Sequence, residues 1–219
     1  MKKRVLTFVM FVCMMVSLIP TAGVYAFSDV TEETTYGTAI LTLKEWGKIE
    51  GYSDGTYKPD ELITRAEFVK MLMSLKENSG IEYIDSDVQT GFEDVDSENH
   101  WAAKYIKLAV NKKVIRGYED GSFRPENKVT YEEALKMVTC YLGYELRAQA
   151  RATANGMDLW PNGYIAVANE LMITKSISVE SFSSQMTRGA VAQVIYNASS
   201  VPEVDPNTQQ PITTGTSSV

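Results

Sequence analysis

The sequence predicts an all-α protein in which a unit of helix, turn and helix occurs three times. The first observation is repetition. Three blocks recur after 65 or 66 residues: FSDV at 27–30 and FEDV at 92–95, GYSDGTYKP at 51–59 and GYEDGSFRP at 117–125, TRAE at 64–67 and TYEE at 130–133. Repetition at a fixed period indicates units that bury their apolar faces against one another.

The second observation is a weaker third copy. The letters YI at residues 164–165 match YI at 105–106, and MTR at 186–188 matches ITR at 63–65. The glycine-rich turn is missing there and residues 176–184 take its place. We therefore predict three repeats, over residues 27–85, 91–145 and 150–199.

The third observation is helical spacing, and it places two helices in each repeat. The first helix is expected at about 36–47, 101–111 and 163–171. A turn follows, in which Asp bonds the backbone and Gly accepts a positive φ. The second helix begins with a capping box in repeats one and two, at Thr64 with Glu67 and at Thr130 with Glu133. Its apolar stripe appears in all three repeats, which predicts three helices packed on a common axis: Phe68, Met71, Leu72 and Leu75; Leu135, Val138 and Leu142; Val191, Val194, Ile195 and Ala198.

The two ends of the chain are predicted to lie outside the repeats. Residues 2–4 are basic, residues 5–19 are apolar, and VYA at 24–26 supplies small residues where a signal peptidase reads. This pattern predicts a secretory signal peptide over residues 1–26, since the apolar run is short for a membrane span. Residues 200–219 are polar and rich in Pro, Thr and Ser, which predicts a flexible linker or tail.

Composition excludes several classes of protein. The 219 residues include 21 Lys and Arg against 28 Asp and Glu, a net charge of −7, which argues against a nucleic-acid partner. One histidine, His100, and two cysteines cannot form a Cys/His zinc cluster, and no cofactor is expected. Loss of Cys13 with the signal peptide leaves Cys140 alone, so no intramolecular disulfide is expected.

The ordered blocks, together with HWA at residues 100–102, resemble S-layer homology modules over most of residues 27–199. The resemblance implies a pseudo-threefold spindle around a central three-helix bundle. It also implies grooves that bind a pyruvylated secondary cell wall polysaccharide, possible contacts with other S-layer proteins, and a secreted location at the Gram-positive cell surface, with no transmembrane segment once the signal is removed.

Two arginines are the leading candidates for contact with such a ligand. Arg65 and Arg188 directly follow a capping threonine, at the first position of a helix. A helix N-terminus offers unpaired N–H groups and positive potential, and a guanidinium adds a planar fork suited to carboxylate. Because a cation there is unfavourable for the helix itself, we favour a ligand role for both.

Several of the other candidate ligand-binding residues have an alternative role. The tryptophans either stack on sugars or are core or partly buried aromatics, and the tyrosines are expected to stack on sugars. The glycines either admit a sugar or shape the backbone, and the aspartates either orient hydroxyls or brace an arginine. These candidates are Trp101, Trp160, Tyr52, Tyr118, Gly51, Gly117, Asp29, Asp94 and Glu133.

Departures from the repeat limit the number of expected grooves. Tyr131 stands where repeat one has Arg65, so the groove that uses this segment lacks its carboxylate fork. Gly189 and Ala190 remove the capping box of repeat three, so its helix start is expected to fray. We therefore expect one or two competent grooves rather than three.

Other functions fit the sequence less well. An enzyme is not expected, because a single histidine and the absence of G-x-S-x-G argue against serine hydrolysis. Carboxylate pairs such as Asp85 with Asp87 are common in acidic chains. The loop from Asp94 begins like an EF-hand but has Tyr105 at its twelfth position. The remaining alternative is a surface assembly protein that packs against other chains without recognising glycan.

Overall fold

The computed structural model describes residues 26–75 and 89–212, and within these ranges it has isolated β-bridges but no β-strand. The predicted all-α class is therefore confirmed. Positions 1–25 of the predicted signal peptide lie outside the described residues. The helices are α2 (Gly37–Glu45), α3 (Arg65–Met73), α4 (Ala103–Asn111), α5 (Tyr131–Tyr141), α6 (Glu145–Asn155), α7 (Tyr164–Glu170) and α8 (Arg188–Ser199), with a short π-helical turn η3 (Leu159–Gly163).

The predicted helices all appear. The first helix of each repeat corresponds to α2, α4 and α7, and the second to α3, α5 and α8. Helix α6 was not expected from the sequence. Among its 11 residues only Ala148 and Ala152 are buried, so it lacks the apolar stripe by which helices are recognised.

Threonine caps start the three second helices. The predicted capping boxes of α3 and α5 are both present. Thr64 N donates to the Glu67 carboxylate over 2.8 Å, and Thr64 Oγ1 accepts from Glu67 N. The expected fraying of α8 is wrong, because Thr187 Oγ1 still accepts the N–H of Ala190 over 3.2 Å. One side-chain cap satisfies an orphan donor without the reciprocal glutamate.

The segments before α3, α5 and α8 form a closed ring of backbone hydrogen bonds. Ile63 N donates to Met186 O (3.2 Å), Met186 N donates to Val129 O (2.8 Å), and Val129 N donates to Ile63 O (3.1 Å). All three side chains are fully buried. The ring therefore joins the starts of the three helices around one point in the core.

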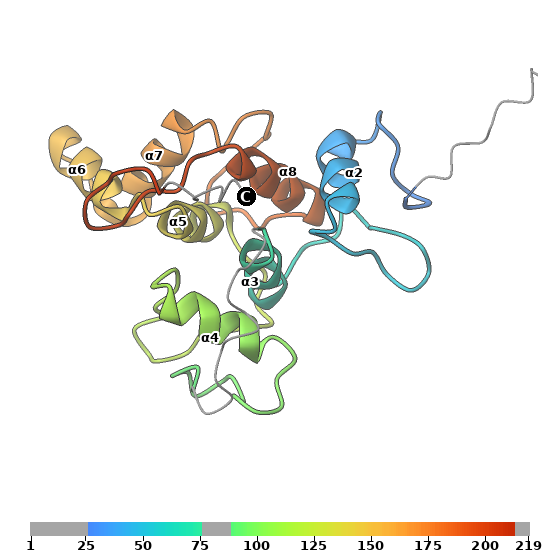
Figure 1. Ribbon diagram of the computed structural model, residues 1–219, viewed down its shortest axis with the longest axis horizontal. Coiled ribbons are helices and arrows are strands. Elements are labelled where there is room, and N and C mark those ends of the chain that lie inside the picture. The colour runs from blue at the N-terminus through green and yellow to red at the C-terminus, as the bar shows by residue number, and fades with distance from the viewer. Residues whose placement is uncertain (1–25, 76–88, 213–219) are drawn as a thin grey trace, which may run out of the picture.

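Three lobes surround this ring (Figure 1). Helix α2 packs against α8, α4 packs against α3, and α7 packs against α5, with α6 and η3 beside α7. Each lobe thus pairs the second helix of one predicted repeat with the first helix of the following repeat, and α8 closes the cycle onto α2. Surfaces between lobes are consequently built from more than one repeat.

Residues 200–212 differ from the flexible tail expected from composition. Val204 N donates to Leu142 O (3.0 Å), and Gln209 Nε2 donates to Gly143 O (2.8 Å), so the segment pairs with the end of α5. Val201 and Val204 are buried. Two apolar side chains and the free carbonyls at a helix end are enough to hold a polar segment in place. Residues 213–219 lie outside the described residues.

Candidate functional site

Two pockets contain the same set of side chains. The Arg65 pocket encloses about 550 Å³ and the Arg188 pocket about 360 Å³, both within the usual size of small-ligand sites. Each has an arginine, a Gly-Tyr pair, a glutamate, a lysine, a methionine and a tryptophan. These are Arg65, Gly117, Tyr118, Glu133, Lys136, Met137 and Trp160 in the first, and Arg188, Gly51, Tyr52, Glu67, Lys70, Met71 and Trp101 in the second.

Each pocket collects its side chains from three predicted repeats. In the Arg65 pocket, the arginine starts α3, the turn follows α4, the glutamate and lysine lie on α5, and the tryptophan lies in η3. In the Arg188 pocket, the arginine starts α8, the turn follows α2, the glutamate and lysine lie on α3, and the tryptophan precedes α4. The two pockets are therefore related by a shift of one repeat.

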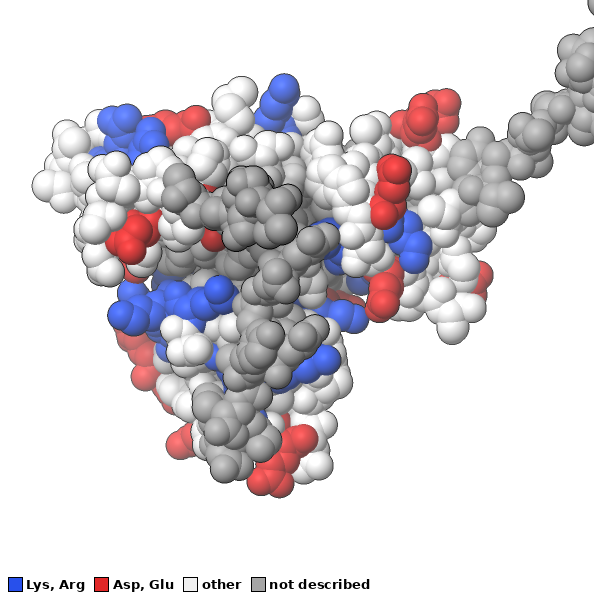
Figure 2. All heavy atoms as spheres, viewed as in Figure 1, with Lys and Arg blue, Asp and Glu red and all other residues white. Residues whose placement is uncertain are grey.

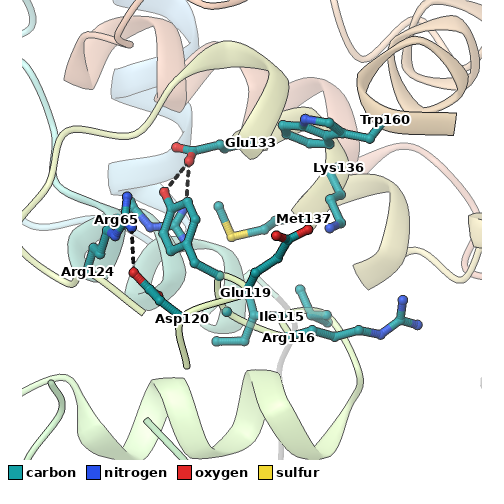
Figure 3. A pocket seen from close by; sticks show the side chains of 13 residues that line it. Arg65, Ile115, Arg116, Glu119, Asp120, Arg124, Glu133, Lys136, Met137 and Trp160 are labelled. Carbon is teal, nitrogen blue, oxygen red and sulfur yellow. Dashed lines mark hydrogen bonds and ion pairs between the residues drawn. The ribbon is translucent and has the colours of Figure 1, made fainter. Parts of the chain in front are cut away.

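Arg65 forms part of the pocket wall and is only 6% exposed. Its Nε donates to Phe123 O over 2.9 Å, and a terminal nitrogen lies 3.1 Å from Glu133 Oε1. The guanidinium lies over the Tyr118 ring, 4.7 Å from its centroid. Figure 3 shows Arg65 and Glu133 together on one side of the pocket, with Lys136 and Trp160 on the other.

Arg188 repeats this arrangement and is 8% exposed. Its Nε donates to Tyr57 O over 3.0 Å, and Glu67 Oε1 lies 3.7 Å from a terminal nitrogen. The guanidinium lies 4.9 Å from the centre of the Tyr52 ring. Both arginines are thus held by a backbone carbonyl and a carboxylate, yet each still borders a pocket.

The expected open N–H groups at the helix starts are not available. Arg65 N donates to Asn127 O, and Arg188 N donates to Glu61 O. The next N–H groups, of Ala66 and Gly189, donate to Pro125 O and Pro59 O. This part of the prediction is wrong because the neighbouring turn supplies the acceptors. What remains at these positions is the guanidinium edge and the positive potential of the helix end.

Glu133 connects Arg65 to a tyrosine. The Tyr118 hydroxyl donates to Glu133 Oε1, the same oxygen that faces Arg65. Burial, followed by this hydrogen bond, raises the pKa of Tyr118 to about 12, so the phenol stays neutral and donating at neutral pH. The Tyr118 ring lies between Arg65 and Arg124, and the Tyr52 ring likewise lies between Arg188 and Lys58, whose Nζ is 4.4 Å from the ring centre.

The two tryptophans are exposed at the pocket rims. Trp101 is 51% exposed and Trp160 is 43% exposed, so the alternative that they fill the core is wrong. Trp101 stacks against His100, and Lys136 Nζ lies 5.3 Å from the centre of the Trp160 ring. An indole in this position presents a flat apolar face beside positive charge.

The glycines are explained by close contact with an aromatic ring. At Gly117, φ is +74°, and an added Cβ would lie 2.4 Å from Phe92 Cε1. At Gly51 an added Cβ would lie 2.4 Å from Thr56 O and 2.5 Å from Phe27 Cε1. Both glycines line a pocket, but their required role is to admit the phenylalanine of the FSDV or FEDV block and the backbone carbonyl of their own turn.

The aspartates lie outside both pockets and brace the turns. Asp29 accepts from Tyr57 N (2.8 Å) and Lys58 N (2.7 Å), one bond to each carboxylate oxygen. Asp94 does the same with the backbone of residues 123 and 124. The prediction that they orient sugar hydroxyls or brace an arginine is therefore corrected, since both oxygens of each already hold backbone N–H groups.

Two lysines of the pockets were missed by sequence reasoning. Lys70 and Lys136 recur at the 66-residue offset, so the repeat itself carried the signal. The Arg65 pocket holds four basic and three acidic residues, and the Arg188 pocket three and two. Both are net positive on an acidic chain. Figure 2 shows Lys and Arg side chains gathered where the α4 lobe meets the lobe of α5 to α7.

The third equivalent position has lost these charges. Tyr131 replaces the arginine and is buried. Ala190 and Gln193 stand on α8 where α3 and α5 carry the glutamate and lysine, and Tyr36 stands where the tryptophan is expected. The Tyr36 hydroxyl accepts from Ser178 N over 3.4 Å. This position offers aromatic rings and amides in place of ions.

Other chemistry finds little support in the described part of the chain. No group of three or more His, Cys, Asp or Glu residues there could hold a metal ion. None of the helices in residues 26–75 and 89–212 has the length and hydropathy to cross a membrane. Burial raises the pKa of Cys140 to about 12, so its thiol stays protonated and is a poor nucleophile.

Comparison with known proteins gives a consistent result. The family model of the S-layer homology domain matches residues 26–69 and 92–135. The chain is 33% identical over 161 residues, 73% of its length, to a middle cell wall protein of Brevibacillus brevis. It is 31% identical over 182 residues, 80% of its length, to a surface layer protein of Brevibacillus choshinensis. A cellulosome-anchoring protein of Acetivibrio thermocellus is 37% identical over 112 residues, 51% of the chain. The matched regions span 14%, 15% and 25% of these relatives.

Proposed function

Residues 26–69 and 92–135 belong to the S-layer homology domain family, and from this premise we propose that the protein is held on a Gram-positive cell wall by binding a pyruvylated secondary cell wall polysaccharide. The attachment is non-covalent and places the secreted protein at the cell surface. The names of the relatives, which include a cell wall, a surface layer and an anchoring protein, agree with this role.

The observation that carries the proposal is the recurrence of one set of side chains in two pockets. An arginine edge and a lysine supply positive charge for the pyruvate carboxylate. The exposed tryptophan at the rim supplies a flat face for the sugar ring. The net positive charge of each pocket explains how an acidic protein attracts an anionic polymer.

We include residues 150–199 in the anchor as a third, diverged module that follows a signal peptide at 1–26 and modules at 27–85 and 91–145. Its support is the capped start of α8, with Thr187 and Arg188 in the places of Thr64 and Arg65, and the ring that joins all three helix starts. Its own pocket position lacks charge, so its role in binding is to deliver Arg188 and Trp160 to the other two.

The role is non-enzymatic. The carboxylates that recur in both pockets, Glu133 and Glu67, are each paired with an arginine and used in a helix cap. A carboxylate committed to two partners is poorly placed to act as a general acid or base. A surface assembly protein that packs without glycan remains the competing function, and the next experiment separates the two.

The test is calorimetric titration of residues 27–219 with a pyruvylated disaccharide of the wall polymer and with the same disaccharide lacking pyruvate. We expect saturable binding of the first and much weaker binding of the second. The variant Trp101→Ala with Trp160→Ala should bind more weakly. Trp46→Ala is the matched control, because Trp46 is 47% exposed and lines neither pocket. Equal binding of both disaccharides, or an equal loss in the control, would contradict the proposal.

A further inference from the structure

The two pockets have the same net charge but place their rim charges differently: Lys48 and Glu50 line the Arg188 pocket where Val114 and Arg116 line the Arg65 pocket, and Glu119 lines only the Arg65 pocket. Glu50 directly precedes the Gly-Tyr pair of the Arg188 pocket, and Arg116 directly precedes that of the Arg65 pocket. The two positions are 66 residues apart, the offset of the repeat. The sign of the charge reverses at positions 50 and 116, and only Glu50 is paired with a lysine of its pocket.

Glu50 forms an ion pair with the lysine of its own pocket. Its carboxylate lies 3.5 Å from Lys70 Nζ, and both side chains are exposed to solvent. A ligand carboxylate that approaches Lys70 must compete with this ion pair, and it also meets the negative charge of Glu50 itself. The rim of the Arg188 pocket thus works against an anion.

Arg116 leaves the corresponding lysine open. Its guanidinium pairs with Glu145 on α6 over 2.9 Å, and Glu145 does not line the pocket. Lys136 lies beside the rings of Trp160 and Tyr164, at 5.3 and 5.8 Å. Within the described residues no ion pair joins Lys136 to a carboxylate. Its ammonium is available to an anion that reaches Trp160.

We infer that the two pockets bind the anionic glycan with unequal affinity, the Arg65 pocket more tightly, and that the residue at position 50 or 116 sets the difference. The inference rests on the proposed function. Exchange of Glu for Arg changes the local charge by two units and alters whether the lysine is paired. Exposed charge interactions of this kind amount to about a two- to fivefold change in affinity at low salt.

The experiment measures one pocket at a time with the pyruvylated disaccharide. Arg188→Ala with Trp101→Ala silences the Arg188 pocket, and Arg65→Ala with Trp160→Ala silences the Arg65 pocket. Because loss of either arginine also lowers stability, the circular dichroism spectrum at the temperature of the titration checks that each variant is folded. We expect the remaining Arg65 pocket to bind about two- to fivefold more tightly than the remaining Arg188 pocket, with a smaller ratio at high salt.

Reciprocal substitutions then test the position itself. In the protein that retains the Arg188 pocket, Glu50→Arg should tighten binding by about the same factor, and Glu50→Gln should give about half of that gain in free energy by releasing Lys70 without adding charge. In the protein that retains the Arg65 pocket, Arg116→Glu should weaken binding. Arg116→Gln is the second variant there, and a smaller loss is expected because it adds no negative charge.

The outcomes separate the inference from the function on which it rests. Equal affinities in the two single-pocket proteins, or reciprocal substitutions without effect, would overturn the inference while leaving glycan binding intact. Loss of pyruvate-dependent binding in the unmodified protein would overturn the proposed function instead. Tighter binding in the Arg188 pocket would also reject the inference.

Discussion

The two pockets and the third equivalent position share a backbone but differ in side chains. All three take part in the ring of Ile63, Val129 and Met186, and all three helix starts carry a threonine cap. Only two of them carry the buried arginine. Where Tyr131 stands, the space is filled by an aromatic ring and the charges are gone. The ring position and the threonine cap occur three times, whereas the arginine pocket occurs twice. The pocket side chains can therefore differ while the backbone arrangement is kept.

The largest expected effect comes from truncating the side chain of Arg65, or of Tyr131 at the equivalent position, to alanine. Arg65→Ala leaves Phe123 O and the Glu133 carboxylate without their partner, which should cost about 2–3 kcal/mol of unfolding free energy and remove binding at that pocket. Tyr131→Ala should cost about 3 kcal/mol through the cavity it leaves, with glycan binding retained. Urea unfolding and calorimetry measure the two quantities. The comparison fails if Tyr131→Ala weakens binding as much as Arg65→Ala.

A second contrast is between a glycine in the turn of the Arg65 pocket, Gly117, and a glycine on helix α8, Gly189. Gly117→Ala combines a positive φ with a Cβ only 2.4 Å from Phe92, so we expect a loss of about 2 kcal/mol in stability. At Gly189, on helix α8, the nearest atoms to an added Cβ lie at 3.1 Å and the backbone is helical. Gly189→Ala should therefore change stability by less than about 1 kcal/mol. The denaturant midpoints of the two variants measure this difference in stability, and equal losses of stability would contradict the prediction.

A smaller effect is expected when a rim aromatic is removed. Trp160→Ala should weaken glycan binding at the Arg65 pocket by about 1 kcal/mol, the size of one aromatic stacking contact, and leave the thermal midpoint unchanged. Tyr36→Phe, at the third position, removes the hydroxyl that accepts from Ser178 N and should leave binding unchanged. A fall in affinity for the Tyr36 variant would give the third position a role in recognition.

The smallest expected effect is on pH dependence. The folded pKa of Tyr118 is raised to about 12 by burial and by its bond to Glu133, against an ordinary value of about 10. The folded state holds the phenolic proton more tightly, so this stabilisation is complete below about pH 10 and is lost as the pH rises toward 12. The difference in thermal midpoint between the protein and Tyr118→Phe should shrink between those limits. A constant difference would contradict the assignment.

Much of the helical structure could be predicted because its causes are local. Thr64 with Glu67, Thr130 with Glu133 and the apolar stripes all lie within a few residues of one another. The state of the arginines could not be predicted. Arg65 bonds to Phe123, 58 residues away, and Arg188 to Tyr57, 131 residues away. Only the folded chain shows that these arginines are held in the wall and that neighbouring turns occupy the helix N–H groups.

The two aspartates also show what could not be predicted from the sequence. Asp29 and Asp94 were predicted to orient sugar hydroxyls or to brace an arginine. Each instead bonds two backbone N–H groups about 28 to 30 residues away. Repetition indicates that a residue is required in each repeat. It does not show whether the residue is required for folding or for binding a ligand.

Because the lobes pack in a cycle, loss of one helix disturbs both pockets at once. A protease that removed α8 would take Arg188 from one pocket and break the ring beside the other, and loss of α2 would expose the apolar side of α8. One cut would then impair both pockets together, whereas the substitutions described above act on one pocket at a time. For the same reason, residues 26–212 would have to be transplanted whole to serve as a surface-display tag.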